Sequence, residues 1–234
     1  MIKYTTSIVV GIVGLFVVVG CSRREPVQAV DRHSAAPPTP RPAMTDPPPP
    51  ALVQIGASAA EIFDSARTSA WPDASASMET LRESMRTLPT SGLTPDLVAQ
   101  MRTRTADLAH GIKARQRVAA MDAANSITRL AAELSSPYET PIPYQILLLD
   151  YYGRQLELGL AASRPAMMRQ AAADLRQTWN SVEPTILRRG GVEDARRFTD
   201  IVVQIEGARR PADFVAPVQA ELAEVDRMEK IFTP

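Results

Sequence analysis

A charged stripe on an apolar segment is the most unusual arrangement of reactive side chains in this sequence. Residues 147–160 read LLLDYYGRQLELGL, and their apolar side chains would surround a helix, so most of that helix should be buried. Asp150, Arg154 and Glu157 nevertheless fall at positions i, i+4 and i+7, on one face. Because buried charges are normally paired, we expect an ion-pair network within the helix, lined by tyrosines such as Tyr151. A polar binding groove is the alternative.

Adjacent arginines form three basic clusters in the C-terminal part of the chain. Such clusters can bind lipid phosphates or another polyanion, whereas arginines on the outer face of a helical bundle need no ligand. Nucleic acid is not an expected partner, because the chain carries 26 basic and 26 acidic residues and has no basic excess. The clusters are Arg188 with Arg189, Arg196 with Arg197, and Arg209 with Arg210.

The sequence lacks the motifs of common catalytic sites, and we expect the protein not to be an enzyme. Nucleophilic catalysis needs a Ser, Cys or Thr beside a base, most often His. The chain has two histidines, of which His33 lies in a proline-rich segment and His110 in a predicted helix. The G-x-S-x-G, P-loop and Rossmann glycine patterns do not occur.

No cofactor is predicted from the sequence. The Glu-x-x-His motifs of di-iron bundles and the C-x-x-C-H motif of attached haem are absent. Methionines could bind Cu(I), alone or with His110, but methionine at helical spacing is usually part of a core. A bundle that binds a metal or another small ligand is the alternative hypothesis for the function.

Apolar periodicity after residue 51 predicts an all-α fold. Apolar residues recur at helical intervals, without the sustained alternation that strands need. Thr94, Pro95 and Asp96 supply an N-cap residue, a proline at the first helical position and an acid in the first turn. The apolar face then continues to Leu134, which predicts one helix of about 40 residues and about 60 Å in an elongated bundle.

The remaining helices are predicted from the same periodicity and from the prolines that interrupt it. Proline inside a helix costs about 3 kcal/mol, so a kink or a join is expected at each break. The predicted helices cover 62–70, 71–88, 144–187 with a break near Pro165, and 192–228 with a break near Pro211.

Two short segments indicate an internal repeat. LRESM at 81–85 matches LRQTW at 175–179, and each follows a helix that begins with proline. The sequence therefore favours two pseudo-repeated helical hairpins spaced by about 95 residues, and coincidence in an alanine-rich chain is the alternative.

A proline-rich stretch precedes the helical part. Residues 22–50 contain nine of the twenty prolines and few large apolar residues, so they cannot bury a core. Such a chain favours extended polyproline II. We therefore expect residues 21–50 to form a tether and residues 51–234 to form one helical domain.

An apolar run near the start ends at the chain's single cysteine. Residues 8–21 read IVVGIVGLFVVVGC, which is shorter than the roughly 20 residues that cross a bilayer and has the length of a signal-peptide core. The VVGC at 18–21 resembles the lipobox of bacterial lipoproteins. That resemblance implies removal of residues 1–20, lipid on Cys21, and a membrane anchor. The same resemblance implies that Ser22 after the cysteine, rather than Asp, favours the outer membrane over the inner one, with the domain in the periplasm.

These observations predict the cellular location of the protein more closely than its molecular activity. We expect a membrane-anchored, non-catalytic interaction or scaffold module of the cell envelope, with an envelope protein as partner.

Overall fold

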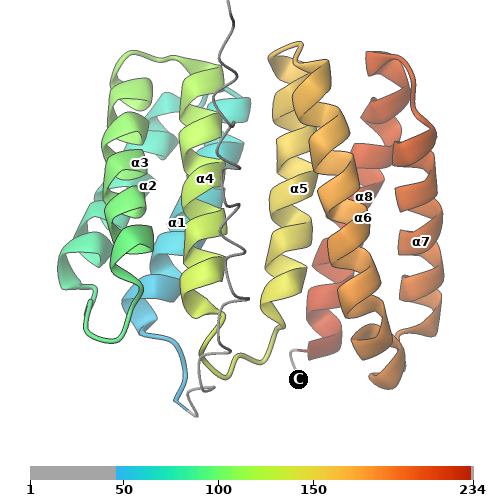
Figure 1. Cartoon of the computed structure of the whole chain (residues 1–234). Helices are drawn as coiled ribbons and strands as arrows, with labels where there is room; N and C mark the ends of the chain where they lie inside the picture. Colours follow the sequence, from blue (N-terminus) through green and yellow to red (C-terminus); the bar gives the residue numbers. More distant parts are fainter. Residues whose placement is uncertain (1–45, 233–234) are drawn as a thin grey trace, which may run out of the picture. The chain divides into compact units, whose positions relative to one another are not determined.

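The computed structural model describes residues 46–232, and this part of the chain forms eight α-helices and no strands (Figure 1). The predicted all-α fold is confirmed. Residues 1–20, Cys21 and most of the predicted tether lie outside the described residues. The helices are α1 (Pro50–Arg67), α2 (Trp71–Thr87), α3 (Pro95–Lys113), α4 (Arg117–Ser135), α5 (Tyr144–Ala161), α6 (Pro165–Arg188), α7 (Val192–Gly207) and α8 (Pro211–Phe232).

Each half of the described chain packs as a four-helix unit around its own core. In the first half, α1 packs against α2 and α4, and α3 packs against α4. In the second half, α5 packs against α6 and α8, and α7 packs against α6 and α8. Helices α4 and α5 lie side by side and join the halves (Figure 1). Between residues 46 and 232, none of the helices has both the length and the apolar character that a bilayer crossing needs.

The two halves repeat with a fixed spacing. Helices α5, α6 and α8 each begin 94 residues after α1, α2 and α4, and α5 and α7 end 94 residues after α1 and α3. The turns that follow α1 and α5 also match, because Ser69 and Ser163 both adopt the left-handed conformation, with φ of 61° and 53°. The repeat predicted with a spacing of about 95 residues is therefore present, and each repeated unit contains four helices.

The predicted 40-residue helix is divided into α3 and α4 by a tight turn. Arg115 takes a φ of 52° there, and its N–H donates to the carbonyl of Ile112 over 3.0 Å. The returning helix passes close to Gly111, where a Cβ would lie 3.0 Å from the backbone nitrogen of Ala120. Both helices face the same core, so the apolar periodicity continues through the turn, which is why it predicted one helix.

Prolines mark helix starts more often than kinks in this fold. Pro165 and Pro211, predicted as interruptions, are the first residues of α6 and α8. The predicted helix at 62–70 overlaps the C-terminal part of α1, which begins at Pro50 and ends at Arg67. The chain reverses direction at the short loops before these prolines, so that α6 runs antiparallel to α5 and α8 runs antiparallel to α7 (Figure 1), and α8 packs beside α5.

Candidate functional site: a charged cleft between α1, α5 and α8

Side chains of three helices line a cleft of about 390 Å³ that both halves of the chain contribute to. Apolar residues of α8, such as Val218 and Leu222, form part of its wall. The lining contains four carboxyl groups and two guanidinium groups, which leaves an excess of acidic groups. The charged cleft is defined here by Asp64 and Arg67 of α1, Asp150, Arg154 and Glu157 of α5, and Asp226 of α8.

Arg154 is the central residue of the charged cleft. Its Nε donates to both carboxylate oxygens of Asp150, over 2.9 and 3.1 Å, and its Nη1 donates to Asp64 over 3.2 Å. The guanidinium also lies over the ring of Phe63, 5.0 Å from its centre. Only 14% of the Arg154 side chain is exposed, against 19% for Asp150 and 49% for Asp64. Arg154 therefore ties α5 to α1 through a partly desolvated ion-pair network.

Glu157 takes a partner from another helix. Its carboxylate pairs with Nε of Arg67 in α1 over 3.6 Å, and the ion pairs that Arg154 forms are with Asp150 and Asp64. The predicted stripe thus lies on one side of α5. One of its ion pairs, Arg154 with Asp150, lies within α5, and two others are formed with α1. Periodicity alone could not have identified either α1 partner, because both depend on how α1 docks onto α5.

Tyr151 lies away from the charged cleft, on the side of α5 that faces α4. Its hydroxyl accepts a hydrogen bond from Nε2 of Gln155 over 3.2 Å, and its carbonyl accepts one from the buried Asn125 of α4 over 3.1 Å. Burial raises the pKa of the Tyr151 phenol. Tyr151 thus belongs to the contact between the halves and does not line the cleft that holds Arg154.

The carboxyl groups of the charged cleft are incompletely neutralised. Burial raises the pKa of Asp150, although Arg154 acts in the opposite direction. Burial and the nearby Asp64 raise the pKa of Glu157 against the effects of Arg67 and Arg154. Asp226 is exposed and forms no ion pair within the described residues. An added positive charge in the cleft would therefore be stabilised by carboxylates that lack full compensation.

A further carboxyl group, that of Glu221 in α8, is buried beside this cleft. Its side chain has no exposed surface, and neither of its oxygens has a hydrogen-bond partner in the part of the chain that the structure describes. Burial, and then the charge of Asp150, raises its pKa well above the usual range of a glutamate. Glu221 was not predicted as a site residue from the sequence, although it falls at i+3 from Val218 and i−4 from Val225, on the apolar face of its helix.

The predicted anion-binding arginines are engaged in separate local contacts. Arg196 pairs with Glu193 over 3.2 Å, and Arg197 pairs with Asp194 and, over 3.0 Å, with Glu224. At the end of α6, two further arginines contact uncharged groups. Arg188 donates to the Thr185 hydroxyl over 2.8 Å, and Arg189 lies over the ring of Phe232.

Metal ligation is not indicated by the described residues. Between residues 46 and 232, no group of three or more His, Cys, Asp and Glu side chains has the proximity to hold a metal ion. His110 lies at a different place, in a cleft lined also by Glu79 and Lys113.

Comparisons with known proteins give no guide to the use of the charged cleft. No protein-family model, no curated protein and no solved structure matches this chain. What the cleft binds must therefore follow from its own charges and geometry.

Proposed function

We propose that this chain is a lipoprotein of the bacterial outer membrane, with its helical domain acting as a non-catalytic interaction module in the periplasm. The apolar run that ends at Cys21 supports the lipid anchor, and the proline-rich residues 22–50 support a tether between anchor and domain. Two anchoring signals suffice for stable membrane attachment, and the lipid of a lipoprotein supplies more acyl chains than that.

The charged cleft is the proposed contact site for the partner of this module. The single observation that carries the proposal is the excess of four carboxyl groups over two guanidinium groups in a partly buried cleft. A lysine or arginine side chain of a partner protein would complete the charge balance there. Asp226 and Glu157, whose charges are least compensated, are the proposed ligands of that basic side chain.

A small-ligand-binding bundle is the second candidate function. The cleft volume of about 390 Å³ falls in the range of small-molecule sites, roughly 300 to 1,000 Å³. The same charges would select a small cation, such as a polyamine. Native mass spectrometry of the purified protein separates the two candidates, because a bound polyamine would add its mass to the chain.

A capture experiment with matched variants tests the proposed contact site. The full chain serves as bait in envelope extracts, beside a cleft variant, Glu157→Gln with Asp226→Asn. A control variant, Asp107→Asn with Glu193→Gln, removes the same charge from exposed ion pairs elsewhere. We expect the cleft variant to capture at least about tenfold less of a specific envelope protein, and the control to capture it normally. Equal loss in both variants would show only a general effect of net charge and would contradict the proposal.

A further inference from the structure

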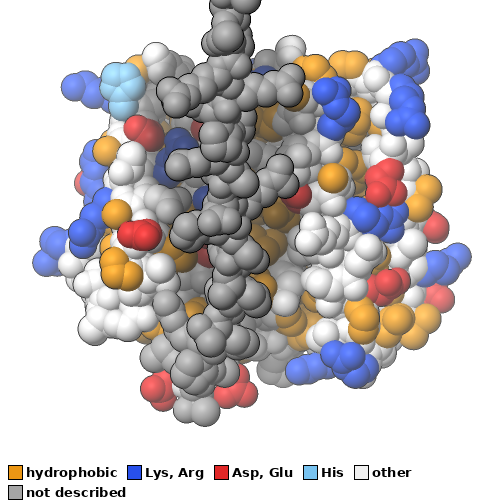
Figure 2. Space-filling model, in the orientation of Figure 1, with side chains coloured by type: hydrophobic (Ala, Val, Ile, Leu, Met, Phe, Trp, Pro, Cys, Tyr) orange, Lys and Arg blue, Asp and Glu red, His pale blue; other side chains and the backbone are white. Residues whose placement is uncertain are grey.

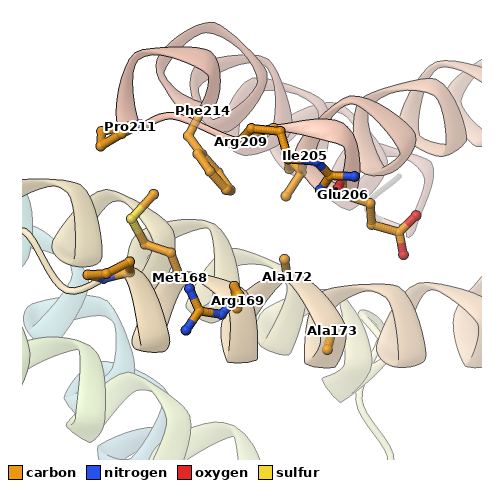
Figure 3. A pocket seen from close by; sticks show the side chains of 11 residues that line it. Met168, Arg169, Ala172, Ala173, Ile205, Glu206, Arg209, Pro211 and Phe214 are labelled. Atoms are coloured by element: carbon orange, nitrogen blue, oxygen red, sulfur yellow. Dashed lines mark hydrogen bonds between the residues drawn. The ribbon is translucent and has the colours of Figure 1, made fainter.

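A second cleft, distinct from the charged cleft, opens between α6 and the turn that joins α7 to α8. It encloses about 480 Å³, and apolar side chains form most of its lining. Met168 of α6 and Phe214 of α8 point toward each other across it, and Ala172 and Ala173 leave room along the α6 side (Figure 3). We call this site the apolar cleft. Its lining also includes Ile205 of α7.

Two guanidinium groups at the edge of the apolar cleft have no carboxylate partner among the described residues. Arg169 forms no ion pair there, and Arg209 donates from Nη1 to the backbone carbonyl of Glu206 over 3.2 Å. The carboxylate of Glu206 is itself occupied by Arg176, over 2.7 and 3.0 Å. Figure 2 shows Lys and Arg side chains gathered at this end of the second half, where α6 begins and α7 ends.

The internal repeat provides a comparison for this cleft within the same molecule. The first half has a cleft of about 440 Å³ between α2 and α3, lined in part by Met78 and Glu79. The 94-residue spacing aligns these two residues with Ala172 and Ala173. The second half therefore has two methyl groups where the first half has a long thioether and a carboxylate. This difference makes the second cleft more apolar and frees space along α6.

We propose that the apolar cleft binds one long-chain fatty acid, independently of the charged cleft and its partner. The acyl chain would lie between Met168 and Phe214, and the carboxylate would accept hydrogen bonds from Arg169 and Arg209. The cleft volume lies in the range of small-molecule sites. Met168 adds adaptability, since methionine repacks readily around apolar ligands. A carboxylate is favoured over other head groups because the rim offers two guanidinium groups that have no carboxylate partner among the described residues, while the carboxylate of Glu206 in the lining is already bound by Arg176.

Equilibrium dialysis of the purified full chain against radiolabelled palmitate tests this proposal. The buffer contains no detergent, which would compete for the cleft, and palmitate is kept below the concentration at which it aggregates. We expect one palmitate per chain, and binding of uncharged methyl palmitate at least about tenfold weaker. Equal binding of the acid and its ester, or no saturable binding of palmitate, would overturn the proposal. Binding to vesicles of anionic phospholipid without binding of single palmitate molecules would also overturn it.

Two variants and one control locate the bound molecule. Ala172→Met with Ala173→Glu installs the residues of the first half and should lower palmitate affinity at least about tenfold. Arg169→Gln with Arg209→Gln leaves the apolar lining intact and should remove the preference for palmitate over its methyl ester. The control, Arg82→Gln with Lys113→Gln, makes the same charge change at the cleft of the first half and should bind as the parent does. Unchanged palmitate binding in the arginine variant would overturn the proposal even if the alanine variant does not fold.

Discussion

The carboxyl group of Glu221 in α8 occupies the space that a side chain at position 153 in α5 would need. A Cβ added to Gly153 would lie 1.8 Å from Oε2 of Glu221, so the glycine allows α8 to approach this closely. The 94-residue spacing aligns this pair with Ala59 and Ile127 of the first half, which are both buried and apolar. The second half thus buries a carboxyl group, next to the charged cleft, at a position where the first half buries an isoleucine.

We predict that Glu221→Gln stabilises the domain, and increasingly so as the pH rises. Because burial raises the pKa of Glu221 in the folded chain, the folded state holds a proton that the unfolded state releases above its ordinary pKa, roughly 4.3. The stability that this proton contributes is therefore fully present below that value. It is lost as the pH rises toward the folded-state pKa of Glu221, by up to about 1.4 kcal/mol per pH unit. Urea melts at pH 5 and pH 8 measure the effect.

Glu224, one turn further along α8, provides the matched control for this prediction. It is also buried, but its carboxylate pairs with Arg197 over 3.0 Å and with Arg227. Glu224→Gln should therefore destabilise the domain, because it leaves those guanidinium groups without their partner. A Glu221→Gln variant with the same stability gain at pH 5 and pH 8 would show that Glu221 does not carry the buried proton.

Gly153→Ala should destabilise the domain by about 1 to 3 kcal/mol, since the new methyl group would collide with Glu221 and with Leu222. The added alanine improves helix propensity by about 1 kcal/mol, so the net loss is smaller than the collision alone would give. Combining Gly153→Ala with Glu221→Ala should recover stability, which urea melts of the two single variants and the double variant can measure. If the changes in unfolding free energy of the two single variants simply add up in the double variant, the close contact is contradicted.

Arg154→Met should destabilise the domain by about 2 to 4 kcal/mol in urea melts. The change leaves Asp150 largely buried without its partner and removes the ion pair that ties α5 to α1. Arg82→Met, which removes the exposed pair with Glu79, should stay within about 1 kcal/mol of the parent. If both variants have a free energy of unfolding within about 1 kcal/mol of the parent, the ion pairs of Arg154 are open to water and serve binding rather than stability.

The helices, and most of their ends, could be predicted from the sequence because local signals determine them. Apolar spacing and the prolines at 165 and 211 identified the helices of the second half. The turn at Arg115 gave no such signal, since a residue other than glycine adopts the left-handed conformation there and the apolar face continues on both sides. The charged stripe on α5 was predicted from the spacing of its residues. Its partners in α1 were not predicted, because they depend on tertiary packing.

The predicted lipid anchor lies outside the described residues and calls for its own test. Cys21→Ser should block lipid attachment and leave an unprocessed precursor, because the thiol is the proposed site of lipidation. Metabolic labelling with radioactive palmitate and gel mobility measure both effects. Ser22→Ala keeps the cysteine and serves as the control. A Cys21→Ser chain with normal mobility and undiminished label would contradict the lipoprotein assignment.

Site-specific photo-cross-linking tests the proposed partner site most directly. Gln219 lies exposed at the charged cleft, and Gln177 lies exposed on α6, outside the lining of that cleft. A photoreactive amino acid at position 219 should cross-link one envelope protein in living cells, and Glu157→Gln with Asp226→Asn should abolish that product, whereas position 177 should give none. The same product from position 177, or its persistence in the cleft variant, would contradict the claim that the charged cleft binds the partner.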